Sequence, residues 1–483
     1  MKLLEIINKI NIISYDIKKN IEIENISLNS NKVNKNGLFV AIKGDKVNGN
    51  DFISDAIKNG AVVIVSEEEI HVGCDIAFVL VSSSRKAFAE IAKEFYRNHF
   101  DEFKSIAITG TNGKTSTGYI IKHILDNIGI KTGLISTISN QITDYNLPSI
   151  RTTPEADQLH NFFYRMKKNN CSDVIVEVSS HALSLDRVYG MNFDICIFTN
   201  LSPDHLDFHD SMEKYYKIKK ELFFNIKNSN SKRVINIDNK WGKRLAEELG
   251  DQLITYGTSN NALIRIKGIK EHLDKTTFKI HTPSGACKIT TPLIGRCNVY
   301  NITAAIASLY YRGINFNDLK KSLKKIKTIY GRLDLISSKQ KKYIFIDYAH
   351  TEDALNNALK TMKGICKKEI WIVFGCGGNR DKSKRFKMGN IAAKYSNHII
   401  ITSDNPRNED PKDICNEIIK GCKKNSDVRI VLDRTEAIQY ALKNMKSKDI
   451  LLIAGKGHES YQEINGQIIN YNDYNVVKEF LND

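Results

Sequence analysis

Residues 105–116 combine a glycine turn with a lysine and a threonine, which are residue types that bind phosphate groups. The segment reads SIAITGTNGKTS. Gly110 and Gly113 allow backbone N–H groups to converge on anionic oxygens at the start of a helix. Lys114 would contact the β- and γ-phosphates of a nucleotide, and the Thr115 hydroxyl would bind Mg²⁺. The spacing is G-x-x-G-K-T, which is shorter than the common G-x-x-x-x-G-K-[ST] because the residue five before Gly113 is an isoleucine.

The elements around this turn are those that such a phosphate site needs. The apolar residues 106–108 predict a short buried strand, and residues 119–125 have helical spacing. Strand, glycine turn and helix in this order favour a nucleotide-binding loop. The alternative is a plain turn with an incidental Lys-Thr pair.

Acidic and histidine side chains follow two further apolar runs. Glu177 lies at the end of the run 174–178, where a carboxylate near a phosphate loop is a natural Mg²⁺ ligand. A solvated strand end is the alternative interpretation of a lone glutamate. The segment 199–209 reads TNLSPDHLDFH and is dense in potential ligands. Mg²⁺ prefers oxygen, so the chemistry alone leaves a metal role for His205 open.

Four polar loops follow four apolar runs in the last third of the chain: Asp347–His350, Gly375–Asp381, Asp404–Arg407 and Gly455–Glu459. Ligands of parallel sheets bind at the carboxyl ends of the strands, so four such loops favour a binding face. Asp404 could hold an ammonium group and Arg407 a planar carboxylate, while Arg380 is placed for a second carboxylate. Each loop taken singly could also be a plain connection.

The length of 483 residues predicts about three domains. The pattern of short strands and helices indicates a small α/β domain over residues 1–99, a second α/β unit with a mostly parallel sheet over 100–330 and a doubly wound domain over 331–483. The nine cysteines include no C-x-x-C pair, which argues against a disulfide framework or a zinc site. Several lie in apolar runs and are expected to be reduced core residues.

The net charge of +16 could indicate a nucleic-acid partner. The lysines are scattered without aromatic interleaving, so we expect an anionic small substrate and no nucleic acid. The N-terminus is interrupted by polar residues and predicts no signal peptide, and no run approaches the ~20 apolar residues of a membrane span. The sequence therefore predicts a cytoplasmic protein with no membrane partner, which we expect to be a monomer.

Taken together, the motifs resemble those of the Mur ligases of peptidoglycan synthesis. The resemblance covers nearly the whole chain and rests on these segments: Gly110–Thr115, Thr152–Pro154, Glu177–His181, Asn200–Asp207, Gly331–Asp334, Asp347–Thr351 and Gly455–Glu459. It implies three α/β domains: a small N-terminal domain that binds the UDP substrate (1–99), a central P-loop-type domain with a mostly parallel sheet that binds ATP (100–330), and a C-terminal Rossmann-like domain that binds the incoming amino acid (331–483).

The resemblance also implies the reaction and its site residues. ATP phosphorylates a carboxyl group of a nucleotide-linked peptide, and an amino group attacks the acyl phosphate. The implied ATP-binding residues are Gly110, Thr111, Asn112, Gly113, Lys114, Thr115, Ser116, Asn301, Arg332 and Asp347. The implied catalytic residues are Lys114, Glu177, His205 and Lys219, and the implied Mg²⁺ ligands are Thr115, Glu177, His205 and Lys219, with Lys219 carbamylated by CO₂.

For the nucleotide substrate, UDP-N-acetylmuramoyl-L-alanyl-D-glutamate, the resemblance implies Ser30, Thr152, Thr153, Ser179 and Arg187. The implied amino-acid pocket contains Arg380, Asp404, Asn405, Pro406, Arg407, Gly455 and Glu459. The Asp-Asn-Pro-Arg motif is similar to that of members that add meso-diaminopimelate, whose second carboxylate Arg407 would bind. The sequence departs from the family pattern at Asn29, Asn31, Leu185 and Asn379.

Other functions remain open at this point. The same ligase type could add L-lysine, and a folate polyglutamate ligase belongs to the same superfamily. A nucleotide-binding module without turnover and a basic nucleic-acid binder are alternatives of a different class. Phosphate release with a panel of substrates separates the ligases, and salt-sensitive retention on DNA or RNA identifies a nucleic-acid binder.

Overall fold

The computed structural model describes residues 1–44, 47–73, 75–337, 342–422 and 427–482. Cys74 and part of the loop 43–49 lie outside these residues. The chain forms two compact units. The first contains Met1–Thr109, Gly129–Cys196 and Lys217–Lys232, and the second contains Gly110–Ile128, Ile197–Tyr216 and Arg233–Asp483. The predicted domain boundaries at 99/100 and 330/331 stay predictions.

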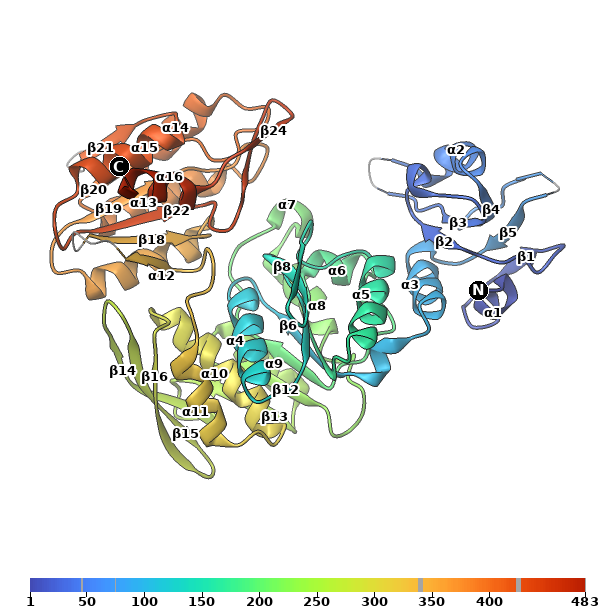
Figure 1. The fold of residues 1–483 in the computed structure, drawn as a ribbon, viewed down its shortest axis with the longest axis horizontal. Helices are drawn as coiled ribbons and strands as arrows, with labels where there is room; N and C mark the ends of the chain where they lie inside the picture. Colours follow the sequence, from blue (N-terminus) through green and yellow to red (C-terminus); the bar gives the residue numbers. More distant parts are fainter. Residues whose placement is uncertain (45–46, 74, 338–341, 423–426, 483) are drawn as a thin grey trace. The chain divides into compact units, whose positions relative to one another are not determined.

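The N-terminal part of the first unit is a five-stranded sheet in the order β1-β5-β4-β3-β2 (Figure 1). Its strands are β1 (Ser14–Asp16), β2 (Asn25–Ser27), β3 (Gly37–Val40), β4 (Ala61–Ser66) and β5 (Ala77–Leu80). All pairs are parallel except β1–β5. The core on one face includes residues of α1 (Leu3–Ile7) and α3 (Ser84–Phe95), and the core on the other includes residues of α2 (Ile53–Lys58). This confirms a small α/β domain.

The rest of the first unit contains a second sheet segment. Its order is β6 (Lys104–Thr109), β10 (Asp173–Glu177), β7 (Thr132–Ile135), β8 (Ser139–Ile142), β9 (Tyr145–Pro148). The first three strands are parallel, and β8 and β9 add antiparallel strands. In this register Glu177 pairs with Ile108, two residues before Gly110. The helices here are η3 (His99–Glu102), α5 (Ala156–Lys168) and α6 (Ser180–Ser184).

The second unit begins with α4 (Lys114–Asn127), which packs on α10 (Arg296–Tyr311). Its first sheet segment has the order β16 (Gly285–Thr291), β15 (Thr276–Thr282), β14 (Ile264–Glu271), β13 (Leu253–Gly257), β12 (Lys232–Asn236). The strands β12 to β14 are parallel, and β14 to β16 form an antiparallel meander that the sequence analysis did not predict. The boundary between the units falls within β11 (Ile195–Phe198) and α8 (Met212–Glu221). The remaining helices of this region are α7 (Leu206–His209), α9 (Lys240–Leu249) and α11 (Phe316–Lys325).

The C-terminal part of the second unit is a six-stranded sheet, drawn in orange to red in Figure 1. Its order is β17 (Asp334–Ser337), β18 (Tyr343–Asp347), β22 (Ile450–Ala454), β19 (Ile370–Phe374), β20 (His398–Ile401), β21 (Asp427–Ile430), with β17 alone antiparallel. One core includes residues of α12 (Glu352–Ile365), α13 (Ser383–Tyr395) and α14 (Pro411–Ile419), and the other includes residues of α15 (Arg434–Asn444) and α16 (Asp473–Asn482). A parallel sheet with a helix layer on each face confirms the Rossmann-like prediction.

Strand order brings the predicted loops of this domain together. β18, β22, β19 and β20 are consecutive neighbours in the sheet. Each of them ends just before one of the four polar loops, so the four loops lie at one edge. A hairpin, β23 (Tyr461–Ile464) and β24 (Gln467–Asn470), follows the last of these loops. No helix among the described residues is long and apolar enough to span a membrane.

Candidate active site

The glycine turn at 110–113 has the geometry of a phosphate cradle. Gly113 is the N-cap of α4 with φ +90°, a conformation that side-chain-bearing residues rarely adopt. A Cβ atom at Gly110 would collide with Thr199 Oγ1, and one at Gly113 would collide with Asn301 Oδ1. Only glycine fits at either position, so backbone N–H groups line the start of the helix, where its dipole favours an anion.

Side chains from outside the turn hold its backbone in place. Asn200 Oδ1 accepts a hydrogen bond from Asn112 N at 3.0 Å, and Asn200 O accepts one from Thr111 N at 2.9 Å. Thr199 Oγ1 donates to Asn112 O at 2.7 Å. Lys114 Nζ donates to Gly110 O and Thr111 O, both at 2.9 Å, so the ammonium group lies over the turn. Thr199 and Asn200 were recognised only as part of a motif, and the structure shows that they shape the loop.

Three more residues of the predicted ATP set lie near the same helix start. Arg332 Nη2 is 3.4 Å from Thr115 Oγ1, and its guanidinium lies over the Tyr348 ring at 4.7 Å. Asp347 accepts hydrogen bonds from Leu333 N at 2.7 Å and Ala349 N at 2.9 Å. Burial raises the pKa of Asp347, although the charge of Arg332 opposes that rise. Asn301, against Gly113, completes the group.

Asp204, which the sequence indicated only as part of the ligand-dense segment 199–209, is a charged group beside this site. Its carboxylate lies 3.4 Å from His205 Nε2, and its Oδ1 accepts from His205 N at 3.0 Å. Burial pushes the pKa of Asp204 upward, but the positive charges of His205, His350, Lys384 and Lys114 outweigh it and lower the pKa. Asp204 is therefore ionised and orients His205.

In the first unit, Glu177 is fully buried at the end of β10. Oε1 accepts from Thr137 N at 3.1 Å, and Oε2 lies 3.0 Å from the Thr137 hydroxyl. That hydroxyl also lies 3.0 Å from Thr152 Oγ1. Thr137 was missed from the sequence, although a polar pair directly after the apolar run 133–135 was a usable signal.

Four of the five residues predicted for the nucleotide substrate lie in the same network as Glu177: Thr152, Thr153, Ser179 and Arg187. Thr153 Oγ1 donates to Glu177 O at 2.7 Å and accepts from Ser179 N at 3.0 Å. Arg187 Nη1 donates to Thr153 O at 3.1 Å, and Arg187 pairs with Glu155 at 2.9 Å.

The fifth residue, Ser30, lies in the N-terminal sheet domain. It begins the short helix η1 (Ser30–Lys32), which Asn29 caps by accepting from Asn31 N. Ser30 O accepts from Asn59 Nδ2 at 3.0 Å. The departure from the family pattern at Asn29 and Asn31 therefore retains a local cap. Among the described residues, no contact joins Ser30 to the Glu177 network.

Lys219 is 1% exposed on α8, and its Nζ lies 3.3 Å from Thr109 Oγ1. A buried ammonium group carries a large desolvation cost. Conversion to a carbamate would replace this cation by an oxygen donor, which suits a hard cation. Among the described residues, no group of three or more His, Cys, Asp or Glu side chains could hold a metal. Hydroxyl and carboxylate oxygens such as those of Thr115 and Glu177 are donors of the kind that Mg²⁺ prefers.

The turn 404–407 forms the centre of the predicted amino-acid pocket. Lys456, which is fully buried, donates from Nζ to Asn405 Oδ1 at 3.0 Å and to Glu459 Oε2 at 3.1 Å. Asn405 Nδ2 donates to Glu459 Oε2 at 3.1 Å. Gly455 has φ +113°, and a Cβ there would lie 2.5 Å from Asp404 Oδ2. The close approach of Gly455 to Asp404 therefore requires glycine.

Two carboxylates of this pocket have shifted pKa values in opposite directions. Burial would raise the pKa of Asp404, but the charges of Lys456 and Arg434 outweigh it and lower the pKa. Burial raises the pKa of Glu459, with Lys456 opposing the rise. Of the two carboxylates, Asp404 is therefore the one that stays ionised.

Arg407 lies in the same turn, following Pro406, and Arg380 lies in the loop after β19. Arg407 is 21% exposed in its side chain, and Nη1 donates to Gly378 O at 2.8 Å. Arg380 is exposed, and no hydrogen bond or ion pair joins it to another described residue. Thus Arg407 is positioned by the fold, whereas Arg380 is not.

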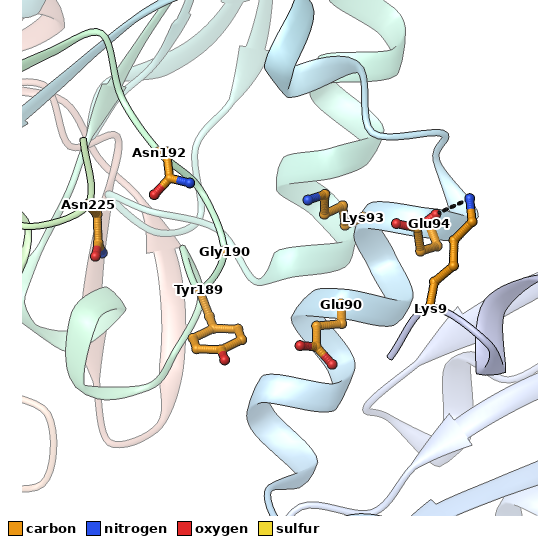
Figure 2. A pocket seen from close by; sticks show the side chains of 8 residues that line it. All are labelled: Lys9, Glu90, Lys93, Glu94, Tyr189, Gly190, Asn192 and Asn225. Atoms are coloured by element: carbon orange, nitrogen blue, oxygen red, sulfur yellow. Dashed lines mark hydrogen bonds and ion pairs between the residues drawn. The ribbon is translucent and has the colours of Figure 1, made fainter. Parts of the chain in front are cut away.

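A hollow of about 370 Å³ elsewhere in the first unit is lined by Lys9, Glu90, Lys93, Glu94, Tyr189, Gly190, Asn192 and Asn225 (Figure 2). Lys9 pairs with Glu94 at 2.9 Å, and both carboxylate oxygens of Glu90 accept from Asn11 at 3.0 Å. These charges are satisfied within the protein. None of the residues belongs to the predicted site.

The eight cysteines among the described residues are all free, and Cys171, Cys196, Cys376 and Cys415 are buried. Burial raises the pKa of the Cys376 thiol to about 12 and that of Cys415 to about 11. These thiols are core residues, as predicted.

Comparison with known proteins agrees with the fold and with the motifs. Residues 22–96 match the Mur ligase family catalytic domain, residues 108–309 the Mur ligase middle domain, and residues 331–457 the Mur ligase glutamate ligase domain. A protein of Caldanaerobacter subterraneus subsp. tengcongensis named UDP-N-acetylmuramoyl-L-alanyl-D-glutamate–2,6-diaminopimelate ligase is 41% identical over 472 residues, covering 97% of each chain. A Clostridium acetobutylicum protein of the same name, numbered 1, is 40% identical over 485 residues, covering 100% of this chain and 99% of its own.

Solved structures show the same relationship. A structure titled as a UDP-N-acetylmuramoyl-L-alanyl-D-glutamate–2,6-diaminopimelate ligase has a TM-score of 0.71 and 31% identity, covering 100% of this chain and 99% of its own. The MurF ligase of Thermotoga maritima, solved in complex with ADP, has a TM-score of 0.65 at 19% identity over 89% and 93% of the two chains, which shows the fold alone. By its sequence and by its fold, the chain belongs to the Mur ligase family.

Proposed function

We propose that this chain is the ATP-dependent ligase that adds meso-diaminopimelate to the D-glutamate of UDP-N-acetylmuramoyl-L-alanyl-D-glutamate in peptidoglycan precursor synthesis. The relatives named above act on 2,6-diaminopimelate by their names. The observation that carries the choice of amino acid is Arg407, a half-buried guanidinium positioned in the turn 404–407. L-Lysine has no distal carboxylate, so a lysine ligase would leave that charge without a substrate partner.

The proposed reaction has two steps, phosphorylation of the substrate carboxylate and formation of the amide bond. The phosphates of ATP bind at the start of α4, where Lys114 and backbone N–H groups stabilise the charge that develops during phosphoryl transfer. The D-glutamate carboxylate of the nucleotide substrate attacks the γ-phosphorus and forms an acyl phosphate with release of ADP. The amino group of the incoming amino acid then attacks the acyl carbon, phosphate leaves, and an amide bond forms.

Positioning of the amine is the second requirement. Asp404, ionised in its pocket, holds an ammonium group of the amino acid, and Arg407 holds its distal carboxylate. Contacts with both Asp404 and Arg407 restrict the orientation of the incoming amino acid. The reacting amine is then held in position to attack the acyl carbon. Thr152, Thr153, Ser179 and Arg187 bind the nucleotide-linked peptide, with Ser30 contributing from the N-terminal domain.

Mg²⁺ supplies charge neutralisation at the transferred phosphoryl group when bound. Thr115, Glu177, His205 and Lys219 would hold it, with Lys219 as a carbamate. Thr137 keeps both oxygens of Glu177 in a fixed orientation, and Asp204 does the same for His205. Asn301, Arg332 and Asp347 bind the adenosine part and the phosphates of ATP. A cytoplasmic monomer, acting on small molecules alone, is part of this proposal.

Phosphate release tests the function. The purified protein receives ATP, Mg²⁺ and the nucleotide dipeptide with meso-diaminopimelate, L-lysine, L-glutamate or no amino acid. We expect turnover with meso-diaminopimelate and loss of this preference in Arg407→Ala. Arg429→Ala is a matched control, because Arg429 lies over the ring of Tyr440 and outside the site. Equal use of lysine by the unmodified protein would overturn the role of Arg407 but would not contradict the ligase activity. A parallel assay replaces the nucleotide dipeptide by folate, and turnover only with folate and L-glutamate would overturn the substrate class.

A further inference from the structure

The hairpin β23–β24 binds the turn 404–407 along its length. Gln462 Nε2 donates to Asp404 O at 3.0 Å, and Glu463 N donates to Asn405 Oδ1 at 3.0 Å. Arg407 N donates to Glu463 O at 3.0 Å, and Asn465 N donates to Arg407 O at 2.8 Å. These hydrogen bonds hold the turn in its conformation. Neither strand of the hairpin was predicted from the sequence.

Glu463 also contacts the Arg407 side chain. Glu463 Oε2 lies 2.9 Å from Arg407 Nε, with 33% of the Glu463 side chain exposed. The guanidinium has five N–H donors. One of them donates to Gly378 O, the Glu463 carboxylate forms an ion pair beside Nε, and Nη2 has no partner among the described residues. Two contacts on different nitrogens fix the plane of the group, and the donors that remain can bind a carboxylate.

The backbone of Arg407 is unusual at this turn. Arg407 has φ +54°, a left-handed conformation that is unusual for a residue with a side chain. Gly377 lies beneath the guanidinium, since a Cβ there would be 3.1 Å from Nη1. A long, flexible arginine side chain projecting from such a turn needs a lateral contact to stay in one orientation, and Glu463 supplies it.

We infer that Glu463 is a positioning residue for the distal carboxylate of the amino-acid substrate, acting through Arg407. The inference rests on the proposed function of Arg407. Glu463 holds Nε and so orders the guanidinium before the substrate arrives, which removes the entropy cost of ordering it on binding. Glu463 itself touches neither the acyl phosphate nor ATP.

Kinetics of Glu463→Ala and Glu463→Gln test the role. The alanine variant should raise KM for meso-diaminopimelate about three- to tenfold, since one rotamer-rich side chain must then be ordered on binding. Its kcat and its KM for ATP should stay near those of the unmodified protein. The glutamine variant keeps the size of the side chain but removes its charge, so it should show most of the same rise, which assigns the effect to the ion pair. In an Arg407→Ala background, Glu463→Ala should have no further effect.

Glu248→Ala is the matched control, because Glu248 also pairs with an arginine Nε, that of Arg244, at 2.6 Å, and neither residue belongs to the amino-acid pocket. An unchanged KM in Glu463→Ala would overturn the inference, as would an equal rise in KM for all three substrates, which indicates a general structural role. A lower KM would also overturn it, because Glu463 would then compete with the substrate for Arg407.

A second measurement does not depend on turnover. In arginine ¹⁵N-labelled protein, the Arg407 Nε–H signal is assigned by its loss in Arg407→Lys. The carboxylate of Glu463 beside Nε should shift this signal, so Glu463→Ala should change its chemical shift. A protein that shows this change but does not use meso-diaminopimelate would refute the proposed function while the ion pair stands. A signal at the same position in Glu463→Ala and in the unmodified protein would refute the inference itself.

Discussion

The phosphate turn needs glycine at position 113 for two reasons, its positive φ and the close approach of Asn301. Replacement by alanine, compared with a second glycine variant, separates them. Gly113 and Gly129 lie just before and just after α4 and have similar positive φ values, +90° and +84°. A Cβ at Gly113 would collide with Asn301 Oδ1, whereas a Cβ at Gly129 would meet nothing within 4 Å. Gly129→Ala is therefore a control for backbone strain without the collision.

The magnitudes follow from these two environments. A left-handed conformation costs a side-chain-bearing residue about 1–2 kcal/mol, which both variants should lose. Gly113→Ala must also displace Asn301, whose Nδ2 donates to Asn298 Oδ1 at 3.2 Å. Losing that hydrogen bond adds about 1 kcal/mol. Each kcal/mol lowers the apparent Tm by about 2–4 °C in domains of this size.

The assay compares thermal unfolding and the KM for ATP. Gly129→Ala should lower the apparent Tm and leave the KM for ATP unchanged. Gly113→Ala should lower the Tm further and raise the KM about tenfold, because about 1.4 kcal/mol of lost binding energy corresponds to that factor. In an Asn301→Ala background the collision is absent, so Gly113→Ala should lower the Tm only as much as Gly129→Ala does. An unchanged KM for ATP in Gly113→Ala would refute the assignment of this turn to the nucleotide.

Three further perturbations have expected outcomes. Burial lowers the pKa of His160 to about 3, so the unfolded chain binds a proton below about pH 6.5 that the folded chain does not. This group alone should lower stability by about 1.4 kcal/mol per pH unit between pH 6.5 and 3, and His160→Leu should reduce the slope in denaturant titrations by that amount. Asp473→Asn leaves fully buried Arg434, 2.8 Å away, without its counter-charge and should lower stability by about 3–5 kcal/mol, measured as a loss of Tm. Thr137→Val removes the hydroxyl contact to Glu177 and should raise the Mg²⁺ concentration for half-maximal activity about tenfold or more.

Each of these has a matched control. The exposed His71→Gln should retain the part of the pH slope that His160→Leu removes. Asp210→Asn breaks an ion pair with Lys214 whose side chains are 70% and 64% exposed, and it should leave the Tm nearly unchanged because water screens the pair. Thr137→Ser keeps the hydroxyl and should keep the Mg²⁺ dependence. A variant that behaves like its control contradicts the corresponding prediction.

Local patterns in the sequence predicted much of the fold. The strands β10, β11, β19 and β22 are continuous apolar runs, and such runs indicate strands buried on both faces of a parallel sheet. The meander β14–β16 and the hairpin β23–β24 were not predicted. Apolar and polar residues alternate in parts of the meander, which is the pattern of strands buried on one face and was not used for the prediction. Every residue of β24 is exposed, so this strand has no apolar signal.

The sequence by itself determined which residues could do chemistry, because phosphate-binding turns and the Asp-Asn-Pro-Arg turn have local signatures in residue type and spacing. Only the tertiary structure decided what holds them. Thr137 contacts Glu177 across 40 positions of sequence, and Glu463 contacts Arg407 across 56. Strand order and loop packing bring such partners together. The local sequence around a single carboxylate or hydroxyl does not predict which residue it will contact.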